Sequence, residues 1–176
     1  METTITPRST YFPFNEPYIS PVEQERIDKM NKKKAVVSII LPAYNAHNTI
    51  KRTLSSIAMQ ENIDEIEVII ADDRSDQPYD HIAQQFAHMM KIKVVRMIKN
   101  GGPGAARQVG FDHSEGDFIM WMDADDTLVS ADTIITLKNV MIQREMDCVY
   151  GRFLEQNEDG SIYPHEQCMV WVTKVA

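Results

Sequence analysis

Short apolar runs alternate with stretches of helical periodicity from residue 35 onward. Runs of strand length that are rich in apolar residues occur at residues 35–41, 66–71, 92–98, 118–122 and 147–153, and the first of them is largely β-branched. Apolar residues at helical spacing occur between them, at residues 47–60, 79–90, 104–114 and 131–144. Four repeats of strand and helix predict an α/β domain with a mostly parallel, Rossmann-like sheet and helices on both faces.

Residues 1–34 have a different, proline-rich and polar character. Tyr11, Phe12, Phe14 and Tyr18 could anchor this stretch to a surface, and a short helix is possible around residues 22–30. We therefore expect an extended N-terminal arm before a domain formed by residues 35–176.

Composition narrows the class of protein. The net charge of -8 argues against a nucleic-acid partner, because binding a duplex requires a basic surface. No apolar stretch approaches the roughly 18 residues that a membrane-spanning helix needs, and the N-terminus lacks the apolar core of a secretory signal. Cys148 and Cys168 have no metal-binding spacing and are most simply two reduced thiols, with one disulfide as the alternative, so we expect a cytoplasmic protein.

The first strand ends in Pro42, Ala43, Tyr44 and Asn45. Proline forces the chain out of the strand, and the ring of Tyr44 is suited to covering a flat base. An ordinary turn with Asn45 capping the next helix is the alternative, and for these residues alone it is the simpler one.

Asp72 and Asp73 follow the second strand, where two adjacent carboxylates need at least one donor partner, such as a ribose hydroxyl or a base N–H. An acidic turn without a ligand is the alternative. Asp76 is better explained as the N-cap of the following helix.

A glycine-rich segment, Asn100-Gly101-Gly102-Pro103-Gly104, leads into the third predicted helix. Glycines such as Gly102 allow close backbone approach, and a helix N-terminus favours an anion. Arg107 opposes the dipole of that helix, which a phosphate or carboxylate partner would explain. The segment lacks the Gly-Lys-Ser/Thr of a Walker loop and the third glycine of a dinucleotide fingerprint, and a flexible connector remains the alternative.

The fourth strand runs directly into Asp123, Ala124, Asp125 and Asp126. If the backbone stays extended, Asp123 and Asp125 point to one face and Asp126 to the other. Carboxylates gathered on one face favour a hard divalent cation, Mg²⁺ or Mn²⁺. The alternative is a solvated loop in which Asp126 or Ser130 caps the next helix.

Together these segments resemble the family 2 glycosyltransferases, which have the GT-A fold. The resemblance rests on four motifs in register: Val37-Ser38-Ile39-Ile40-Leu41-Pro42-Ala43-Tyr44-Asn45, Asp72-Asp73-Arg74-Ser75, Asn100-Gly101-Gly102 with Ala105-Ala106-Arg107-Gln108, and Asp123-Ala124-Asp125-Asp126, the last similar to the family's DxD signature. Arg74 stands where the family more often has glycine, and Gln108 where it has asparagine.

The resemblance implies a transferase that moves a sugar from a nucleotide-sugar donor, with UDP as the expected nucleotide, to an acceptor hydroxyl with inversion. It implies a base site at Ala43, Tyr44 and Asp73, with Asp72 less certain. It also implies that Asp123 lies near the ribose and donor sugar, that Asp125 binds the metal, and that Asp126 is a less certain neighbour.

The family's catalytic base usually lies in an acidic motif further along the chain. Residues 168–174 resemble the stretch that leads toward it, and Glu166 is acidic but wrongly placed. The resemblance thus implies a catalytic base beyond Ala176, the last residue of the sequence. We therefore expect a C-terminally truncated chain that binds donor but transfers sugar poorly.

Two other functions remain open. A sugar-phosphate nucleotidyltransferase would normally carry a basic, glycine-rich loop after its first strand, and residues 42–48 do not have one. A non-catalytic nucleotide-binding module is the second. The donor sugar and the acceptor, whether glycan, lipid carrier or protein, cannot be deduced from the sequence.

Overall fold

The computed structural model describes residues 20–22, 24–25, 28, 36–157 and 159–175. Most of the expected N-terminal arm lies outside these residues, and so does Ala176, after which we expect the catalytic base. Of the few residues described before residue 36, those at 21–22, 24–25 and 28 are helical, in agreement with the short helix expected around residues 22–30.

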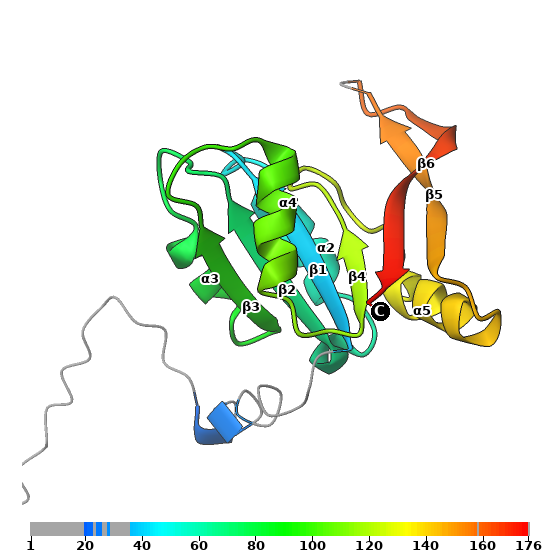
Figure 1. Ribbon diagram of the computed structural model, residues 1–176, viewed down its shortest axis with the longest axis horizontal. Coiled ribbons are helices and arrows are strands. Elements are labelled where there is room, and N and C mark those ends of the chain that lie inside the picture. The colour runs from blue at the N-terminus through cyan, green and yellow to red at the C-terminus, as the bar shows by residue number, and fades with distance from the viewer. Residues whose placement is uncertain (1–19, 23, 26–27, 29–35, 158, 176) are drawn as a thin grey trace, which may run out of the picture.

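A six-stranded mixed sheet forms the centre of the molecule (Figure 1). Its strands are β1 (Val37–Ala43), β2 (Ile66–Asp72), β3 (Lys91–Arg96), β4 (Phe118–Trp121), β5 (Cys148–Gln156) and β6 (Ile162–Lys174). They lie in the order β3-β2-β1-β4-β6-β5. The first four are parallel to one another, and β6 is antiparallel to both β4 and β5. The chain thus proceeds outward from β1 to β3 and then crosses to the other side of β1 for β4.

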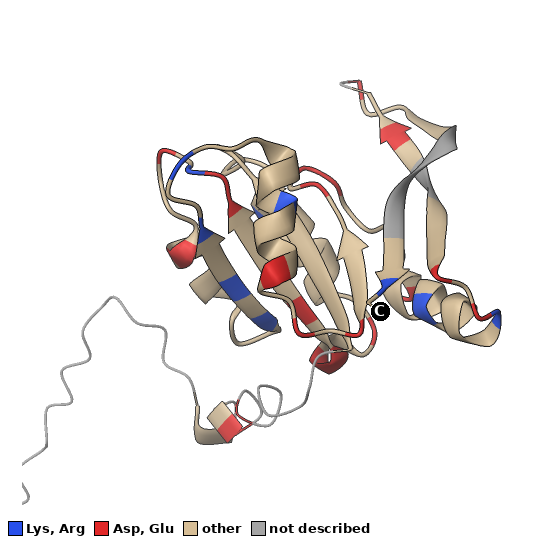
Figure 2. Ribbon diagram, viewed as in Figure 1, with Lys and Arg blue, Asp and Glu red and all other residues tan. Residues whose placement is uncertain are grey.

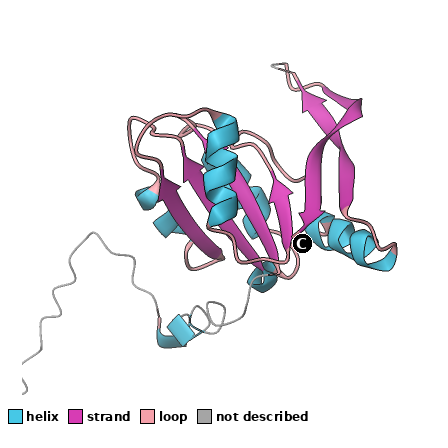
Figure 3. Cartoon of the chain, viewed as in Figure 1, coloured by secondary structure: helices cyan, strands magenta, loops and turns pink. Residues whose placement is uncertain are grey.

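Helices cover both faces of this sheet (Figures 1 and 3). They are α2 (Ile50–Ala58), α3 (Asp80–Phe86), α4 (Pro103–Asp112) and α5 (Thr133–Gln143), with a short 3₁₀ helix at Ile63–Glu65. Among the helices that the structure describes in residues 36–175, only α4 lies on one face, and its Gly110 leaves no room for a side chain next to Ile40 of β1. The predicted α/β fold with a mostly parallel sheet is therefore confirmed, and each predicted strand and helix has a counterpart at similar bounds.

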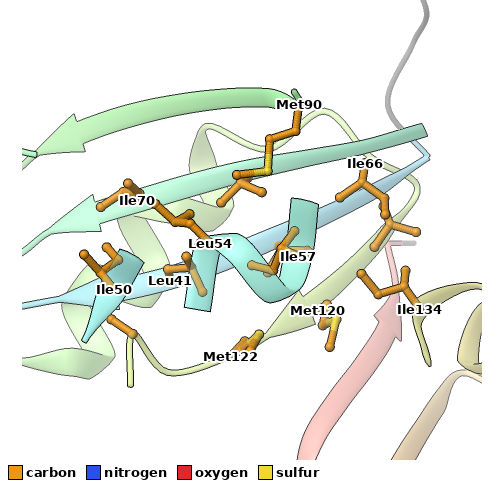
Figure 4. Packing of buried hydrophobic residues seen from close by; sticks show 14 of the residues in the cluster. Leu41, Ile50, Leu54, Ile57, Ile66, Ile70, Met90, Met120, Met122 and Ile134 are labelled. Carbon is orange, nitrogen blue, oxygen red and sulfur yellow. The ribbon is translucent and has the colours of Figure 1, made fainter. Parts of the chain in front are cut away.

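The larger part of the core lies between the sheet and α2, α3 and α5. On α2, apolar residues at helical spacing, Ile50, Leu54 and Ile57, are all fully buried against the sheet (Figure 4). On the sheet side, Leu41 and Ile70 belong to the same cluster. Because α2 packs this tightly, its polar residues are held at fixed positions beside the carboxyl ends of the strands.

The β5–β6 hairpin was not predicted as such, because only the first of its strands stood out as an apolar run. Large apolar residues on it are exposed, namely Tyr150, Leu154, Ile162 and Tyr163. The hairpin adds the antiparallel part to the sheet.

A buried polar cluster closes the amino end of the parallel strands, opposite the end where the candidate site lies. Ser38 donates a hydrogen bond to Glu67 (2.5 Å, Oγ to Oε1), and the same hydroxyl accepts one from the Gly116 N–H. Glu67 also accepts from the Glu115 N–H and pairs with Lys93 at 3.1 Å. Burial raises the pKa of the Glu67 carboxyl, but these hydrogen bonds and the lysine outweigh it, so the pKa lies below 4.5.

Candidate nucleotide-sugar site

Four loops gather beyond the carboxyl ends of β1 to β4, where the strand order reverses between β1 and β4. In open α/β sheets this switch point is where ligands bind. Figure 2 shows acidic segments in the loops that follow β2 and β4 at this edge. The first loop follows β1 and carries Tyr44, whose side chain is 57% exposed. Of the other candidates in this loop, Ala43 is buried, Pro42 is partly buried and Asn45 is exposed.

Asn45 does not cap the helix that follows it, contrary to our expectation. The N-cap of α2 is Thr49, and Asn45 has a left-handed backbone with φ 51°. Its side chain instead exchanges two hydrogen bonds with Asp76, one of them donated by the Asp76 N–H over 2.9 Å. Asp76 was likewise expected to cap its own helix, but the N-cap of α3 is Tyr79. Both side chains are used to join the β1–α2 loop to the β2–α3 loop.

Asp72 is fully buried, and both of its carboxylate oxygens accept hydrogen bonds from donors of the protein. Arg96 pairs with Oδ2 at 2.9 Å, and the Ser75 N–H donates to Oδ1 over 2.8 Å. Arg96 also donates to the carbonyl of Ser75, so one guanidinium supports both ends of the turn. A charged group without exposed surface needs such partners. The turn after β2 is therefore held in place by Arg96 on β3, a residue that the sequence did not single out.

Asp73 holds the glycine segment. Its two carboxylate oxygens accept from the N–H groups of Gly101 (2.7 Å) and Gly102 (2.8 Å). Gly102 has φ 83°, a conformation that favours glycine, and is the N-cap of α4. The sequence indicated an anion at this helix N-terminus, and the anion found there is the protein's own carboxylate. Asp73 is only 3% exposed as a result.

Arg107, one helical turn into α4, donates to Asp123 over 2.7 Å (Nη2 to Oδ1). Both side chains remain more than a third exposed, at 37% and 43%. Arg107 was expected to have a phosphate or carboxylate partner, and Asp123 provides the carboxylate. Asp73, the glycine segment, α4 and Asp123 thus form one connected path across the edge of the sheet.

The backbone does not stay extended through Asp123 and Asp125. The β4 strand ends at Trp121, and the Asp126 N–H donates to the carbonyl of Asp123 over 3.2 Å, which closes a turn. The two-residue alternation of a strand therefore does not determine which way these carboxylates point. Within the turn Ala124 is buried, whereas Asp125 and Asp126 are exposed.

Helix α2 supports this acidic turn through polar side chains that sequence reasoning missed. Thr53, which is fully buried, donates to the carbonyl of Ala124 over 3.0 Å, and Arg52 donates to that of Asp125 over 3.2 Å. Further along, Ser56 accepts from the Leu128 N–H and Gln60 donates to the carbonyl of Ser130. The signal for this role was a polar stripe at helical spacing beside the apolar one.

Burial and two neighbouring carboxylates act on Asp126 in the turn after β4. Desolvation raises the pKa of the Asp126 carboxyl, and the negative charges of Asp125 and Asp123 raise it further, against a lowering by Arg52. Neither Asp126 nor Ser130 caps α5, whose N-cap is Asp132. In the part of the chain that the structure describes, no group of three or more His, Cys, Asp or Glu residues is arranged to hold a metal ion. The described helices also include none that is long and apolar enough to cross a membrane.

The profile of glycosyl transferase family 2 matches residues 38–175. The chain belongs to this family. Glycosyltransferase GlyA of Streptococcus pneumoniae serotype 4 is 28% identical over 130 residues, which cover 73% of this chain and 18% of that protein. The hyaluronan synthase of Pasteurella multocida is 29% identical over 143 residues, which cover 81% of this chain and 14% of the synthase. The matches therefore span less than a fifth of these longer relatives.

Solved structures agree with this family assignment. A crystal structure of Staphylococcus aureus TarS residues 1–349 in complex with UDP-GlcNAc matches with a TM-score of 0.61 and 29% identity, over 69% of this chain and 37% of that one. A mannosyltransferase from Pyrobaculum calidifontis, solved with GDP-Man and Mn²⁺, matches with a TM-score of 0.60 over 73% of this chain and 41% of that one. Its identity is 21%, so it supports the GT-A fold alone.

Proposed function

We propose that this chain supplies the donor-binding part of a glycosyltransferase. The enzyme would transfer the sugar of a UDP-sugar to an acceptor hydroxyl with inversion, assisted by Mn²⁺ or Mg²⁺. The observation that carries the proposal is the acidic turn after β4, beside Arg107, next to the carboxyl end of β1. The UDP-GlcNAc bound to the related TarS supports UDP as the nucleotide.

We assign the nucleoside end of the donor to the loop after β1. The exposed ring of Tyr44 offers an apolar surface for a base, and Pro42, Ala43 and Asn45 shape the loop that presents it. We assign Asp72 a supporting role in this region, because its carboxylate is already bonded to Arg96 and to the Ser75 N–H. Asp73 orders the glycine segment, and its small exposed surface limits its direct contact with a base.

We assign the diphosphate end to the edge between α4 and β4. Arg107 is the cation there, and its exposed guanidinium can donate to a phosphate while it remains near Asp123. Asp123 and Ala124 line the turn, and we place the ribose and donor sugar beside them. Because the N–H of Gly102 is engaged by Asp73, Gly102 shapes the site and contributes no free donor.

The acidic turn fits a hard divalent cation. Its donors are carboxylates, and burial together with the charges of Asp125 and Asp123 raises the pKa of Asp126, so an added positive charge would relieve this repulsion. Mg²⁺ is commonly held by one or two carboxylates together with substrate phosphates, so a complete protein cage is not required. We assign Asp125 as the main ligand, with Asp123 and Asp126 beside it. When bound, such a cation would neutralise charge on the departing nucleoside diphosphate.

Inversion by a single displacement needs a general base to activate the acceptor, and we assign none among the described residues. The acceptor is a hydroxyl of a glycan, lipid carrier or protein. Cys148 is a free thiol, which fits the reducing conditions of the cytoplasm, where we place the protein.

Calorimetric titration of the chain with UDP, with and without Mn²⁺, tests the proposal. We expect binding that is strengthened at least about tenfold by Mn²⁺, and an Asp125→Asn variant that loses this gain. Asp112→Asn is the matched control, because it removes the same charge from an exposed residue at the far end of α4.

Each outcome of this titration is informative. UDP binding that Mn²⁺ does not affect would favour a non-catalytic nucleotide-binding module. A chain that binds neither UDP nor another nucleoside diphosphate would contradict the proposed function. Equal losses in Asp125→Asn and Asp112→Asn would remove the acidic turn from the site.

A further inference from the structure

Tyr79 lies beneath the two loops to which we assign the nucleoside. It is the N-cap residue of α3 and is fully buried. Because no part of its side chain reaches the surface, Tyr79 cannot contact a ligand directly, and any effect on binding has to act through other residues.

The Tyr79 hydroxyl joins the β1–α2 loop to the β2–α3 loop. The Ala46 N–H donates to it over 2.7 Å, and the Ser75 hydroxyl lies 3.4 Å from it. Ser75 in turn accepts from the Asn45 N–H over 3.0 Å. The backbone N–H groups of Asn45 and Ala46, just after Tyr44, are therefore both bonded to hydroxyl groups of the neighbouring loop.

The ring of Tyr79 is itself held in place. His47 stacks on it, with ring centroids 4.3 Å apart and the planes inclined by 9°. The stack fixes where the hydroxyl points, and His47 follows directly after Ala46 in the chain. The loop that carries Tyr44 is thus packed against Tyr79 by one ring and bonded to it by one hydroxyl.

We propose that Tyr79 is a positioning residue, whose hydroxyl sets the place of the Tyr44 loop relative to the Asp73 loop and so prepares the surface that receives the nucleoside. This inference rests on the proposed function, since it concerns the same site. A preformed surface loses less conformational freedom when the ligand binds. If the surface is no longer preformed, the ligand therefore binds more weakly.

Tyr79→Phe removes the hydroxyl and keeps the stacked ring. We expect it to raise the Kd for UDP in the presence of Mn²⁺ by about 3- to 10-fold, the effect of one buried hydrogen bond. We also expect the amides of residues 45–47 to exchange with solvent faster than in the wild type.

Ser38→Ala is the matched control, because Ser38 is also a fully buried hydroxyl with two hydrogen-bond partners, at the opposite end of the same sheet. A merely structural role would make the two variants alike. We expect both to lower the melting temperature, and only Tyr79→Phe to weaken UDP binding.

The outcomes separate this inference from the proposed function. Wild-type affinity and unchanged exchange in Tyr79→Phe would overturn the positioning role, as would an equal loss of affinity in Ser38→Ala. A wild-type chain that does not bind UDP would instead overturn the proposed function, and the positioning of a nucleoside with it. In that case the exchange of residues 45–47 still reports whether Tyr79 holds the loop.

Discussion

Arg107 donates a hydrogen bond to Asp123 over 2.7 Å, from the first turns of α4 to a residue just beyond Trp121, where β4 ends. This ion pair places a positive charge at the edge of an otherwise acidic turn. It also gives Asp123 a partner before any ligand arrives, whereas Asp125 and Asp126 remain exposed.

Replacing Arg107 should affect binding more than folding. An ion pair between side chains this exposed contributes at most about 1 kcal/mol, so Arg107→Ala should change the free energy of unfolding by no more than that. The loss of a charge that faces a diphosphate should weaken UDP binding by about tenfold or more. Urea denaturation and calorimetry measure the two effects. Arg144→Ala, at the exposed end of α5, should leave both unchanged, and an Arg107→Ala chain that binds UDP normally would refute the role.

The buried hydroxyl of Thr53 offers a test of the support beneath the acidic turn. Thr53→Val keeps the shape of the side chain but leaves the carbonyl of Ala124 without its donor, which should cost about 1–3 kcal/mol of stability. Because the turn is then held less firmly, the gain in UDP affinity from Mn²⁺ should shrink. Ser55→Ala removes an exposed hydroxyl that bonds only within α2, and it should preserve that gain.

Asp126 should oppose folding when it is ionised. Its pKa is raised in the folded chain, so the folded state favours the protonated form, and stability is lost as pH rises through that pKa. Asp126→Asn should therefore be more stable than the wild type at pH 7, with the difference disappearing as the pH falls below the pKa of the carboxyl. Urea denaturation over this pH range checks it, and a variant less stable than the wild type at pH 7 would disprove it.

Glu67 should show the opposite dependence. Its pKa is lowered in the folded chain, so its stabilisation is complete above about pH 4.5 and is lost as the pH falls through the folded pKa. Glu67→Gln should cost about 1–3 kcal/mol at pH 7, because the buried side chain loses its ion pair with Lys93 and its charged hydrogen bonds, and much less in acid. The same denaturation series measures both. A constant difference between wild type and variant at all pH values would contradict this assignment.

The parallel part of the fold could be predicted because its strands are rich in apolar residues. A strand buried on both faces gives a nearly continuous apolar run, such as residues 68–71, and the helices between such runs keep a clear apolar stripe. The β5–β6 hairpin does not show this contrast between strand runs and helical stripes, and β6 was not predicted. The dipeptide Asp159-Gly160, with Gly160 at φ 83°, was the available signal of a turn between two strands.

The roles of the candidate site residues stay predictions, and the connections between these residues could not be deduced from the sequence. Sequence position placed the acidic residues at the strand ends. However, Arg96, which pairs with Asp72, lies 24 residues away along the chain, and Gly101, which donates to Asp73, lies 28 residues away. Arg96 and Tyr79 were missed because nothing in a strand or helix pattern marks a residue whose partner comes from another loop. The turn at Asp123 was missed because a hydrogen bond, and no breaker residue, ends the strand.

The edge strand β5 has a practical consequence for work with this chain. Among the described strands, β5 has a neighbour on one side only, and the hairpin that it forms with β6 displays Tyr150, Leu154 and Ile162 to solvent. Open backbone groups beside apolar side chains form a template on which a strand from another molecule can add. We expect the purified chain to self-associate as its concentration rises, so that light scattering should accompany every titration.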